Sequence, residues 1–368
     1  MIYADNAATT KLDREAFEAM KLFLLEDYSN PSQLYSFSRK SKKAIKEARE
    51  KIACCIGADS DEIVFTSGGT ESDNWVIKNL FSKGGVVTSA IEHHAILNSC
   101  KYIESRGQEV IYIKPDRYGL IKPDDLRAAI APDTKLVSIM LANNEIGSVQ
   151  EIDKLIEVAH ENNCLFHTDA VQAVGHLRID VHGLGIDLMS ASAHKFNGPK
   201  GIGFLYIRKG INIIPFINGG LQEAGYRAGT ENVASIVAMA IALKNNCDDI
   251  DKNKEKLLRL EELLLVKLKE YKIDFIRNGS PKHIPGNLSL SFAGCDGEML
   301  LHRLDLMGIC VSTGSACNSV NTELSHVIRS IGVPEKYAYG TIRVSLGKDN
   351  TEEDVEKIAD ALLKVIKK

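Results

Sequence analysis

Residues 187–207 read DLMSASAHKFNGPKGIGFLYI, two short apolar runs joined by a polar, glycine-rich connection. The runs Asp187–Ser190 and Gly203–Ile207 have the length of strands, and the connection between them carries Lys195. A lysine in a partly desolvated pocket loses its proton more readily and can bond an aldehyde as a Schiff base. The stretch predicts strands of a sheet with a reactive amine beside them. Lys195 taken alone would be interpreted as an ordinary loop lysine, and the rest of the chain supplies the other parts of a cofactor site.

Further short apolar runs alternate with amphipathic stretches between residues 60 and 210. This alternation is typical of βαβ units, and it predicts an α/β fold with a mainly parallel sheet. Ligands of such sheets bind beyond the carboxyl ends of the strands. The other predicted strands are Ile63–Thr66, Val86–Ser89, Val110–Ile113, Leu136–Met140 and Leu165–Thr168, and Ile152–Asn162 is a predicted helix.

The pattern changes after Gly229 to long helices and a few strands, which suits a small α+β domain. We expect a large α/β domain over residues 15–250, and a small α+β domain built from residues 1–14 and 251–368. The predicted helices are Glu231–Asn246, Asp251–Tyr271, Gly297–Met307 and one opening at Thr351 with a capping-box pattern, and the strands are Asn287–Phe292, Ile309–Ser312 and Ile342–Leu346.

The composition is that of an ordinary globular protein. The chain has 368 residues, a formal charge of −4, 44% hydrophobic and 26% charged residues. This balance gives no support to direct binding of nucleic acid. No run approaches the roughly 18 apolar residues of a membrane span, and the N-terminus lacks a signal-peptide pattern, so we expect a cytoplasmic protein that does not bind membranes.

Eight cysteines are scattered without C-x-x-C spacing, which suggests neither a disulfide framework nor a metal site. Most are expected to be buried thiols. Cys317 differs, because the stretch from Ser312 to Asn321 is almost entirely small or polar and predicts an exposed, mobile loop. An exposed thiolate is a strong nucleophile, although an incidental loop cysteine is the competing interpretation.

Several polar residues follow predicted strands and could line one crevice. Gly69 and Thr70 lie in a small-residue turn that opens a helix, a setting that suits an anion, although an ordinary helix cap is the alternative. Asp169 could pair with a ring nitrogen or cap a helix, and Gln172 follows it by one turn. His93, next to His94, could stack on an aromatic ring and exchange protons, or be a surface histidine.

With these motifs in order, the whole chain resembles the pyridoxal-phosphate-dependent cysteine desulfurases of the class V aminotransferase-like group. The resemblance implies a fold-type I transferase architecture and pyridoxal 5'-phosphate as cofactor. The segments that carry it are Tyr3–Thr10, Phe65–Asn74, Glu92–Ala95, Asn143–Gly147, His167–Gln172, the Lys195 segment, Arg227–Asn232 and Gly314–Cys317.

The resemblance also implies a role for each matching residue. Lys195 would hold the cofactor as a Schiff base, Asp169 would pair with the ring nitrogen, and His93 would stack on the ring and move protons. Gln172 would contact the phenolic oxygen, and Asn144 and Arg343 would hold the carboxylate of L-cysteine. The phosphate would be bound by Gly69, Thr70, Ser192 and His194, with Thr230 contributed to the site of a partner subunit in a homodimer.

The implied reaction converts L-cysteine to L-alanine and leaves the sulfur as a persulfide on Cys317. An acceptor or scaffold protein would then take that sulfur for iron-sulfur cluster assembly or thiolation. A selenocysteine lyase or another class V enzyme stays open as an alternative, as does a catalytically silent scaffold paralogue. Three positions depart from the family's usual residues, Tyr35, Ser38 and Ala224, and they leave the acceptor undecided.

Overall fold

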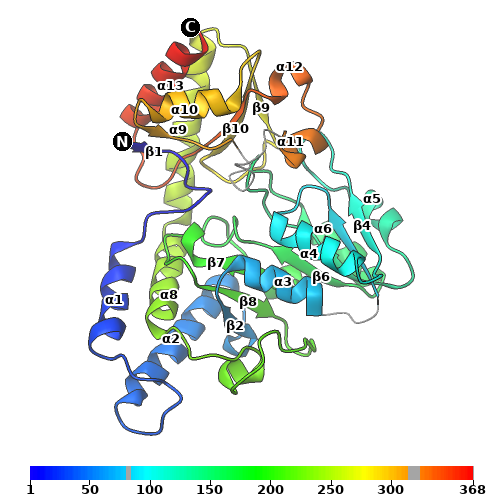
Figure 1. Ribbon diagram of the computed structural model, residues 1–368, viewed down its shortest axis with the longest axis vertical. Coiled ribbons are helices and arrows are strands. Elements are labelled where there is room, and N and C mark those ends of the chain that lie inside the picture. Colours follow the sequence, from blue (N-terminus) through cyan, green and yellow to red (C-terminus); the bar gives the residue numbers. More distant parts are fainter. Residues whose placement is uncertain (80–83, 314–323, 368) are drawn as a thin grey trace.

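A computed structural model describes residues 1–79, 84–313 and 324–367 (Figure 1). Its centre is a seven-stranded sheet with the strand order β2-β8-β7-β6-β5-β3-β4. Six of the strands lie close to their predicted ranges, and β5 begins two residues earlier than predicted. The strands are β2 (Ile63–Thr66), β3 (Gly85–Ser89), β4 (Val110–Ile113), β5 (Thr134–Ser138), β6 (Leu165–Asp169), β7 (Leu188–Ser192) and β8 (Gly203–Ile207).

The sheet is mainly parallel, which confirms the predicted α/β class. Strands β3 to β7 pair in parallel, whereas β8 pairs antiparallel with both β7 and β2. Because β7 and β8 are antiparallel neighbours, the connection that carries Lys195 turns back at the carboxyl edge of β7. That edge is where the predicted cofactor residues of this sheet also lie.

Helices cover both faces of the sheet and form two apolar clusters. One face is covered by α3 (Gly69–Asn79) and α4 (His94–Glu104), whose buried residues include Trp75 and Ile96. The larger cluster lies on the other face and joins the sheet to α2 (Ser38–Ile56), α6 (Ile152–Glu161) and α8 (Val233–Asp248). Strands such as β2, β3 and β8 are buried on both faces, which explains why their sequences do not alternate between apolar and charged residues.

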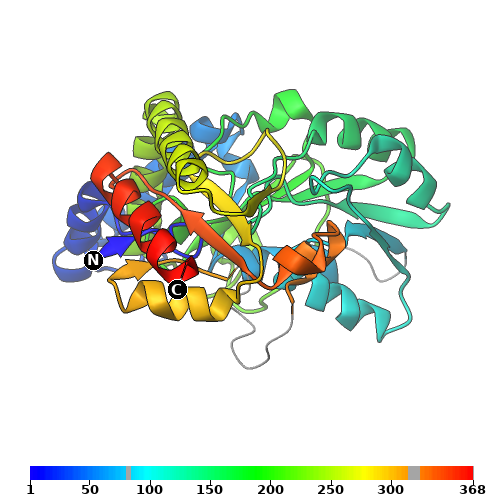
Figure 2. The same cartoon turned by 90° about the horizontal axis from the view of Figure 1, so that it is seen from above.

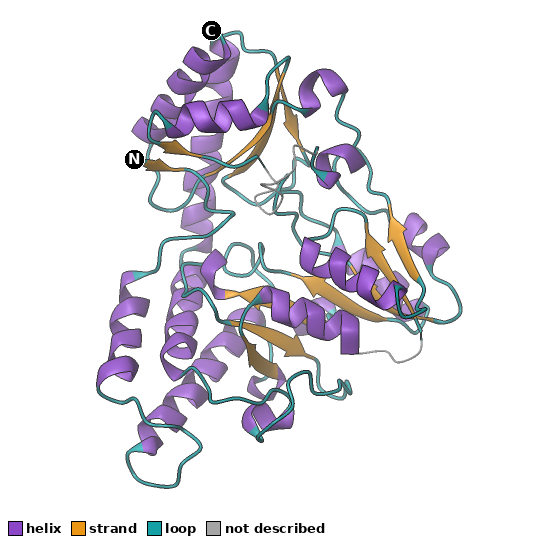
Figure 3. Ribbon diagram, in the orientation of Figure 1, coloured by secondary structure: helices purple, strands orange, loops and turns teal. Residues whose placement is uncertain are grey.

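A second group of strands lies at the end of the molecule that holds both termini (Figure 3). Its three strands are β9 (Phe275–Asn278), β10 (Asn287–Phe292) and β12 (Thr341–Ser345), in the antiparallel order β12-β10-β9. They share an apolar cluster with three helices, and two of these, α9 and α13, lie side by side (Figure 2). The helices are α9 (Ile250–Glu270), α10 (Gly297–Asp305) and α13 (Glu352–Ile366).

The N-terminus joins this second group. Strand β1 (Ile2–Tyr3) pairs in parallel with β11 (Ile309–Cys310), which is shorter than the predicted strand Ile309–Ser312. The capping box predicted at Thr351 is confirmed, because its side chain accepts from the Asp354 N–H and the Asp354 carboxylate accepts from the Thr351 N–H. The domain boundaries at residues 14/15 and 250/251 stay a prediction.

The remaining elements are short or peripheral. Among the residues that the structure describes, no helix has both the length and the apolar character needed to cross a bilayer. The α-helices are α1 (Arg14–Leu25), α5 (Pro123–Ala129), α7 (Val181–Leu184), α11 (His326–Ser330) and α12 (Glu335–Ala338), and the 3-10 turns are η1 (Ser60–Glu62), η2 (Ala193–Lys195) and η3 (Gln222–Gly225).

The expectation that most cysteines are buried was wrong. Of the cysteines that the structure describes, only Cys100 and Cys164 are buried, and Cys54 is exposed. The others are half-buried, and two of them, Cys55 and Cys247, lie on helices that pack only one side against the core. All of the described cysteines are free thiols, none of them in a disulfide.

Candidate active site

A cavity of about 290 Å³ lies at the carboxyl edge of the sheet, where β6 and β7 end. It brings together side chains from segments that are far apart in the sequence. The predicted site residues that line it are Gly69, Thr70, His93, Asn144, Asp169, Gln172, Ser192, His194, Lys195 and Arg343. The structure therefore gathers in one place most of the residues that the sequence suggested separately.

Lys195 ends the turn η2 that directly follows β7. Its Nζ donates to the carbonyl oxygens of Ala7 and Ala8, at 2.6 and 2.9 Å. The same N-terminal segment also receives a hydrogen bond from Gln172 Nε2, which lies 3.0 Å from the Ala7 oxygen. The segment Ala7–Ala8 thus fixes both side chains at the mouth of the cavity.

Asp169 is the last residue of β6 and is buried. Its Oδ1 accepts from the Val171 N–H at 2.9 Å, a contact that orients the carboxylate. Burial raises the pKa of Asp169, and His93 and Lys195 oppose that shift because they favour the charged carboxylate. A cation placed against Asp169 would favour the ionised carboxylate further.

A second carboxyl group, Asp73 on α3, also lines the cavity and was missed from the sequence. It is buried, and its Oδ1 has no hydrogen-bond partner in the part of the chain that the structure describes. The carboxylates of Asp73 and Asp169 and the ring of His93 offer ligand atoms within 4.8 Å of one another. Asp73 shares one helix face with Val76 and Ile77. A carboxylate on an otherwise apolar helix face is the sequence pattern that could have predicted this buried acidic residue.

His93 is the N-cap of α4, where its Nδ1 accepts from the Ala95 N–H at 3.1 Å. The cap leaves Nε2 as the ring nitrogen that is not used by the backbone. Burial lowers the pKa of His93, and the charge of Asp169 has a smaller, opposite effect that raises it. The ring is therefore neutral near pH 7 and sits within reach of a group bound over Asp169.

The other end of the cavity has the features of an anion site. Helix α3 begins at Gly69, so its first backbone N–H groups and its dipole face the cavity beside the exposed Thr70. Ser192 and His194 approach from the end of β7, and burial lowers the pKa of His194 to about 4. The preceding Gly68 has a φ of +144°, and a Cβ there would come 3.3 Å from Ser192 Oγ.

Arg343 reaches the cavity from β12, in the second group of strands. Its Nη1 donates to the Asn144 carbonyl oxygen at 2.9 Å, and its Nη2 donates to Asp5 Oδ1 at 2.6 Å. The guanidinium is buried, and among the described residues its Nε finds no partner. A buried cation with an unused donor is suited to a carboxylate ligand.

Of the predicted site residues that the structure describes, Thr230 alone does not line this cavity. Thr230 is exposed and is not among the described residues that form its walls. The loop before it is tied to α3, because Arg227 Nε donates to Glu71 Oε1 at 3.0 Å. Cys317 lies outside the described residues. The departures at Tyr35, Ser38 and Ala224 also lie away from the described walls of the cavity.

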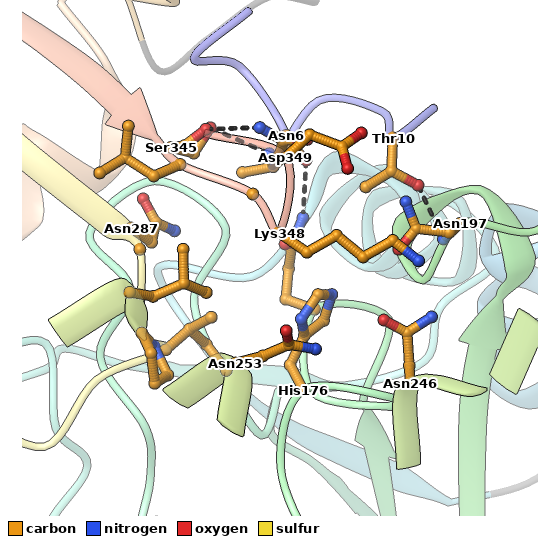
Figure 4. A pocket seen from close by; sticks show the side chains of 18 of the residues that line it. Asn6, Thr10, His176, Asn197, Asn246, Asn253, Asn287, Ser345, Lys348 and Asp349 are labelled. Carbon is orange, nitrogen blue, oxygen red and sulfur yellow. Dashed lines mark hydrogen bonds between the residues drawn. The ribbon is translucent and has the colours of Figure 1, made fainter. Parts of the chain in front are cut away.

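Figure 4 shows a smaller cavity of about 60 Å³. It shares the lining residues Ala7 and Gln172 with the first cavity. Most of its amide groups are used in hydrogen bonds that hold the surrounding segments together. Asn6 Nδ2 donates to the Ser345 oxygen, and the Asn197 N–H donates to Thr10 Oγ1 (Figure 4). This cavity is therefore part of the structural support behind Lys195.

Comparison with known proteins gives consistent results. The family model of class-V aminotransferases matches residues 2–358. The chain is 49% identical to "Cysteine desulfurase IscS" of Dictyoglomus turgidum over 100% of this chain and 95% of that protein. It is 46% identical to the protein of the same name from Methanosarcina thermophila, over 100% of this chain and 92% of that one.

Solved structures agree with this result. A structure described as "NIFS-LIKE PROTEIN" superposes with a TM-score of 0.94 at 36% identity and covers 100% of this chain and 99% of its own. Another, described as "SspA in complex with cysteine", has a TM-score of 0.85 at 36% identity and covers 95% and 100%. With a family model and near-half identity both spanning the chain, this protein belongs to the class-V aminotransferase family and, within it, to the cysteine desulfurases.

Proposed function

We propose that this protein converts L-cysteine to L-alanine and transfers the sulfur to Cys317 as a persulfide. The observation that carries the proposal is the meeting of Lys195, Asp169 and Arg343 in one cavity. An amine, a buried carboxylate and a carboxylate-binding cation are the groups that amino-acid chemistry on a pyridine cofactor requires. Enzymes of this family use pyridoxal 5'-phosphate.

The residues of the cavity fit that cofactor. The helix N-terminus, the Thr70 and Ser192 hydroxyls and the turn at Gly68 form a cradle for a phosphate, and a Cβ at Gly68 would narrow it. At the floor, the Oδ1 atom of the buried Asp73 has no hydrogen-bond partner among the described residues, and the buried Asp169 carboxylate lines the cavity beside it. These features leave room and polar partners for a phosphorylated, protonated pyridine between the two ends.

We assign the cofactor contacts residue by residue. Lys195 would hold the aldehyde carbon through Nζ, Asp169 would pair with the ring nitrogen, and Gln172 would contact the phenolic oxygen. The phosphate would be bound by Gly69, Thr70, Ser192 and His194. When bound, the group supplies an electron sink for a negative charge that develops on the substrate.

Lys195 and His93 are the groups that would move protons. The Lys195 amine lies between the Ala7 and Ala8 carbonyls, so that once displaced by substrate it would stay close enough to act as a base at the α-carbon. The pKa of His93 is lowered by burial, and the neutral ring could exchange a proton through Nε2. Both are positioned by backbone contacts rather than by flexible surface groups.

Arg343 and Asn144 would orient the substrate. The unused Nε of Arg343 is a donor for the substrate carboxylate, and the bond from Nη1 to the Asn144 carbonyl holds the two residues together. Cys317 would then attack the sulfur of the oriented substrate, which breaks the C–S bond and forms an S–S bond. The products are L-alanine and the Cys317 persulfide.

The remaining assignments concern partners. We infer a homodimer in which Thr230, exposed here, completes the phosphate site of the second subunit. An acceptor or scaffold protein would take the sulfur, for iron-sulfur cluster assembly or thiolation. The protein would work in the cytoplasm.

The test measures alanine and persulfide formation from L-cysteine by the purified, cofactor-loaded protein. We expect Lys195→Ala to lose turnover by at least 10³-fold, and Cys317→Ala to keep the bound cofactor's absorbance while losing persulfide. A faster release of alanine from selenocysteine than from cysteine would favour a selenocysteine lyase. A wild-type protein that binds no cofactor would favour a silent scaffold and overturn the proposal.

A further inference from the structure

Helix α11 packs against the turn between β3 and α4, which is formed by residues 90–93 and borders the active-site cavity. The helix comes from the C-terminal part of the chain and is drawn in orange in Figure 1. Its buried residues Val327 and Ile328 share a small apolar cluster with Ile91 of that turn. This packing places His326, the first residue of α11, beside the residues that follow Ile91.

Two contacts join His326 to the start of α4. Its Nε2 lies 3.0 Å from the backbone oxygen of Glu92, and its ring meets the ring of His94 edge-on, with 4.9 Å between the centroids and 63° between the planes. A carbonyl oxygen can only accept a hydrogen bond, so Nε2 carries the hydrogen and donates it. His326 thereby connects two segments that are 234 residues apart in the sequence.

Glu92 is held through both its side chain and its backbone. The buried carboxylate accepts from Ser89 Oγ and from the Met140 N–H. The carbonyl accepts from His326, and it belongs to the peptide unit that joins Glu92 to His93. Because a peptide unit is planar, its orientation fixes the direction in which the chain enters His93.

His93 depends on that direction, because its own side chain caps α4. Its Nδ1 accepts from the Ala95 N–H at 3.1 Å, and its backbone oxygen accepts from the N–H groups of Ile96 and Leu97. A rotation of the preceding peptide unit would change the φ of His93, which is −61°, and would break the cap. The histidine ring that lines the cavity is thus held in place partly from α11.

We propose that His326 is a positioning residue for His93, because its hydrogen bond to the Glu92 carbonyl fixes the turn that carries the His93 ring. The inference rests on the proposed desulfurase function, in which His93 stacks on the cofactor ring and moves protons. His326 lines the cavity as well, but its effect runs through the backbone of Glu92 rather than through a bond to the substrate. Removing the contact should slow proton transfer and leave the affinity for substrate nearly unchanged.

The first test measures hydrogen–deuterium exchange in the cofactor-loaded, full-length protein and does not depend on its activity. The readout is the exchange rate of the amides of residues 95–97, which form the cap with His93. We expect His326→Ala to raise this rate by about 10-fold. His326→Gln should keep the parental rate, because its side-chain amide can donate to the same carbonyl. His302→Ala, which removes an exposed histidine of α10, is the matched control and should also keep it.

The second test measures alanine formation from L-cysteine. We expect His326→Ala to lower kcat by about 10-fold and to change KM by less than about 2-fold, and His326→Gln to restore kcat to within about 3-fold of the parental value. A residue that acts through His93 has no further effect once His93 is removed. The double variant His93→Ala/His326→Ala should therefore match His93→Ala alone, whereas an independent structural loss would multiply with it.

Parental exchange at residues 95–97 in His326→Ala would overturn the proposal, and so would multiplied losses of kcat in the double variant. Equal effects of His302→Ala would overturn it as well. If His326→Ala fails to fold, His326→Asn replaces it, because the shorter amide keeps the polarity but stops short of the Glu92 carbonyl. A wild-type protein that forms no alanine would refute the proposed function instead, and the exchange rates would still decide whether His326 holds the turn.

Discussion

At the scale of single residues, the floor of the cavity holds more carboxyl groups than can be charged together. Asp73 and Asp169 lie within 4.8 Å of each other through their ligand atoms, and both are buried. Burial, and then Asp169, raises the pKa of Asp73 well above its usual range. Of the two carboxyl groups, Asp73 is therefore the one that holds a proton more readily, and Asp169 is the one that more readily carries the negative charge.

This charge assignment predicts that Asp73→Asn is tolerated. Asparagine has the shape of the protonated acid and no charge, so we expect the dissociation constant for the cofactor to change by less than about 3-fold. Asp169 is buried as well, so Asp169→Asn is the matched comparison. This variant should weaken cofactor binding by about 10²-fold or more, because the ring nitrogen loses the negative charge that pairs with it. Titration of cofactor absorbance measures both. Equal losses in the two variants would show that Asp73 is also charged.

Glu92 gives a prediction about pH. It is fully buried, its Oε1 accepts from Ser89 Oγ at 2.6 Å and from the Met140 N–H at 3.0 Å, and burial raises its pKa to about 8. Between its ordinary pKa of 4.5 and about 8, the folded protein binds a proton that the unfolded chain has released. The free energy of unfolding therefore falls as pH rises through this window.

Glu92→Gln removes this proton linkage and keeps the Oε1 contacts. Relative to the wild type, the variant should gain stability from pH 5 to pH 8.5, by up to roughly 4 kcal/mol. Urea unfolding at pH 5, 7 and 8.5 gives the difference at each pH. Parallel profiles for the two proteins would mean that Glu92 is ionised throughout and would contradict the prediction.

These residues also show what the sequence could and could not reveal. Lys195, Asp169, Thr70 and His93 each follow a recognisable strand or open a helix, so their place at the carboxyl edge was predictable. Asp73 and Glu92 are single acidic residues within helical or loop segments, and only the packing around them reveals that they are buried. The backbone oxygens of Ala7 and Ala8, which accept from Lys195, could not be predicted, because alanine side chains give no indication of a functional role.

At the scale of elements, the turn that begins α3 depends on a contact between two backbones. Gly203, the first residue of β8, lies so close that a Cβ there would come 2.7 Å from Gly68 Cα and 2.3 Å from the Ala191 oxygen. Strand β8 thus supports both the Gly68 turn and the end of β7, which carry the proposed phosphate contacts. A side chain at 203 would push these apart.

Gly203→Ala should therefore weaken cofactor binding by about 10-fold and destabilise the fold by about 1–3 kcal/mol, although residue 203 touches no ligand. Gly201→Ala is the matched control, because Gly201 has a φ of +79° but open space around it. The control should cost about 1 kcal/mol of stability through backbone strain and leave cofactor binding unchanged. Thermal unfolding and cofactor titration of both variants separate the two effects. A similar loss of cofactor from Gly201→Ala would rule out the proposed contact.

Most elements were predictable because their apolar runs are bounded by turn residues. The predicted ranges of Ile63–Thr66, Val110–Ile113, Gly203–Ile207 and Asn287–Phe292 coincide with β2, β4, β8 and β10. The antiparallel direction of β8 was not predictable, since an apolar run does not show whether a strand pairs in parallel or antiparallel with its neighbours. Strand β1 and its pairing with the predicted strand β11 were missed, because the two residues of β1 are too few to show a period.

At the scale of the whole molecule, the first ten residues connect the two groups of strands. Asn6 Nδ2 donates to the backbone oxygen of Ser345 in β12, and the Ala7 N–H donates to the Ser345 Oγ. The Thr10 N–H donates to the backbone oxygen of His194, next to the end of β7. Asp5 receives Nη2 of Arg343, while Ala7 and Ala8 receive Nζ of Lys195. The proposed cofactor lysine and substrate arginine are thus aligned through one extended segment.

This connection predicts that deleting residues 1–9 damages the site more than the folding of either group of strands. The deletion removes β1 and the carbonyls that hold Lys195, so we expect cofactor binding to weaken by at least 10²-fold while far-ultraviolet circular dichroism keeps most of its helical signal. Thermal unfolding should broaden, because the two apolar clusters lose a shared segment. A truncation of Lys367 and Lys368 at the other end is the control and should change neither property. A deletion variant that binds the cofactor with parental affinity would show that Lys195 is positioned without the N-terminal segment.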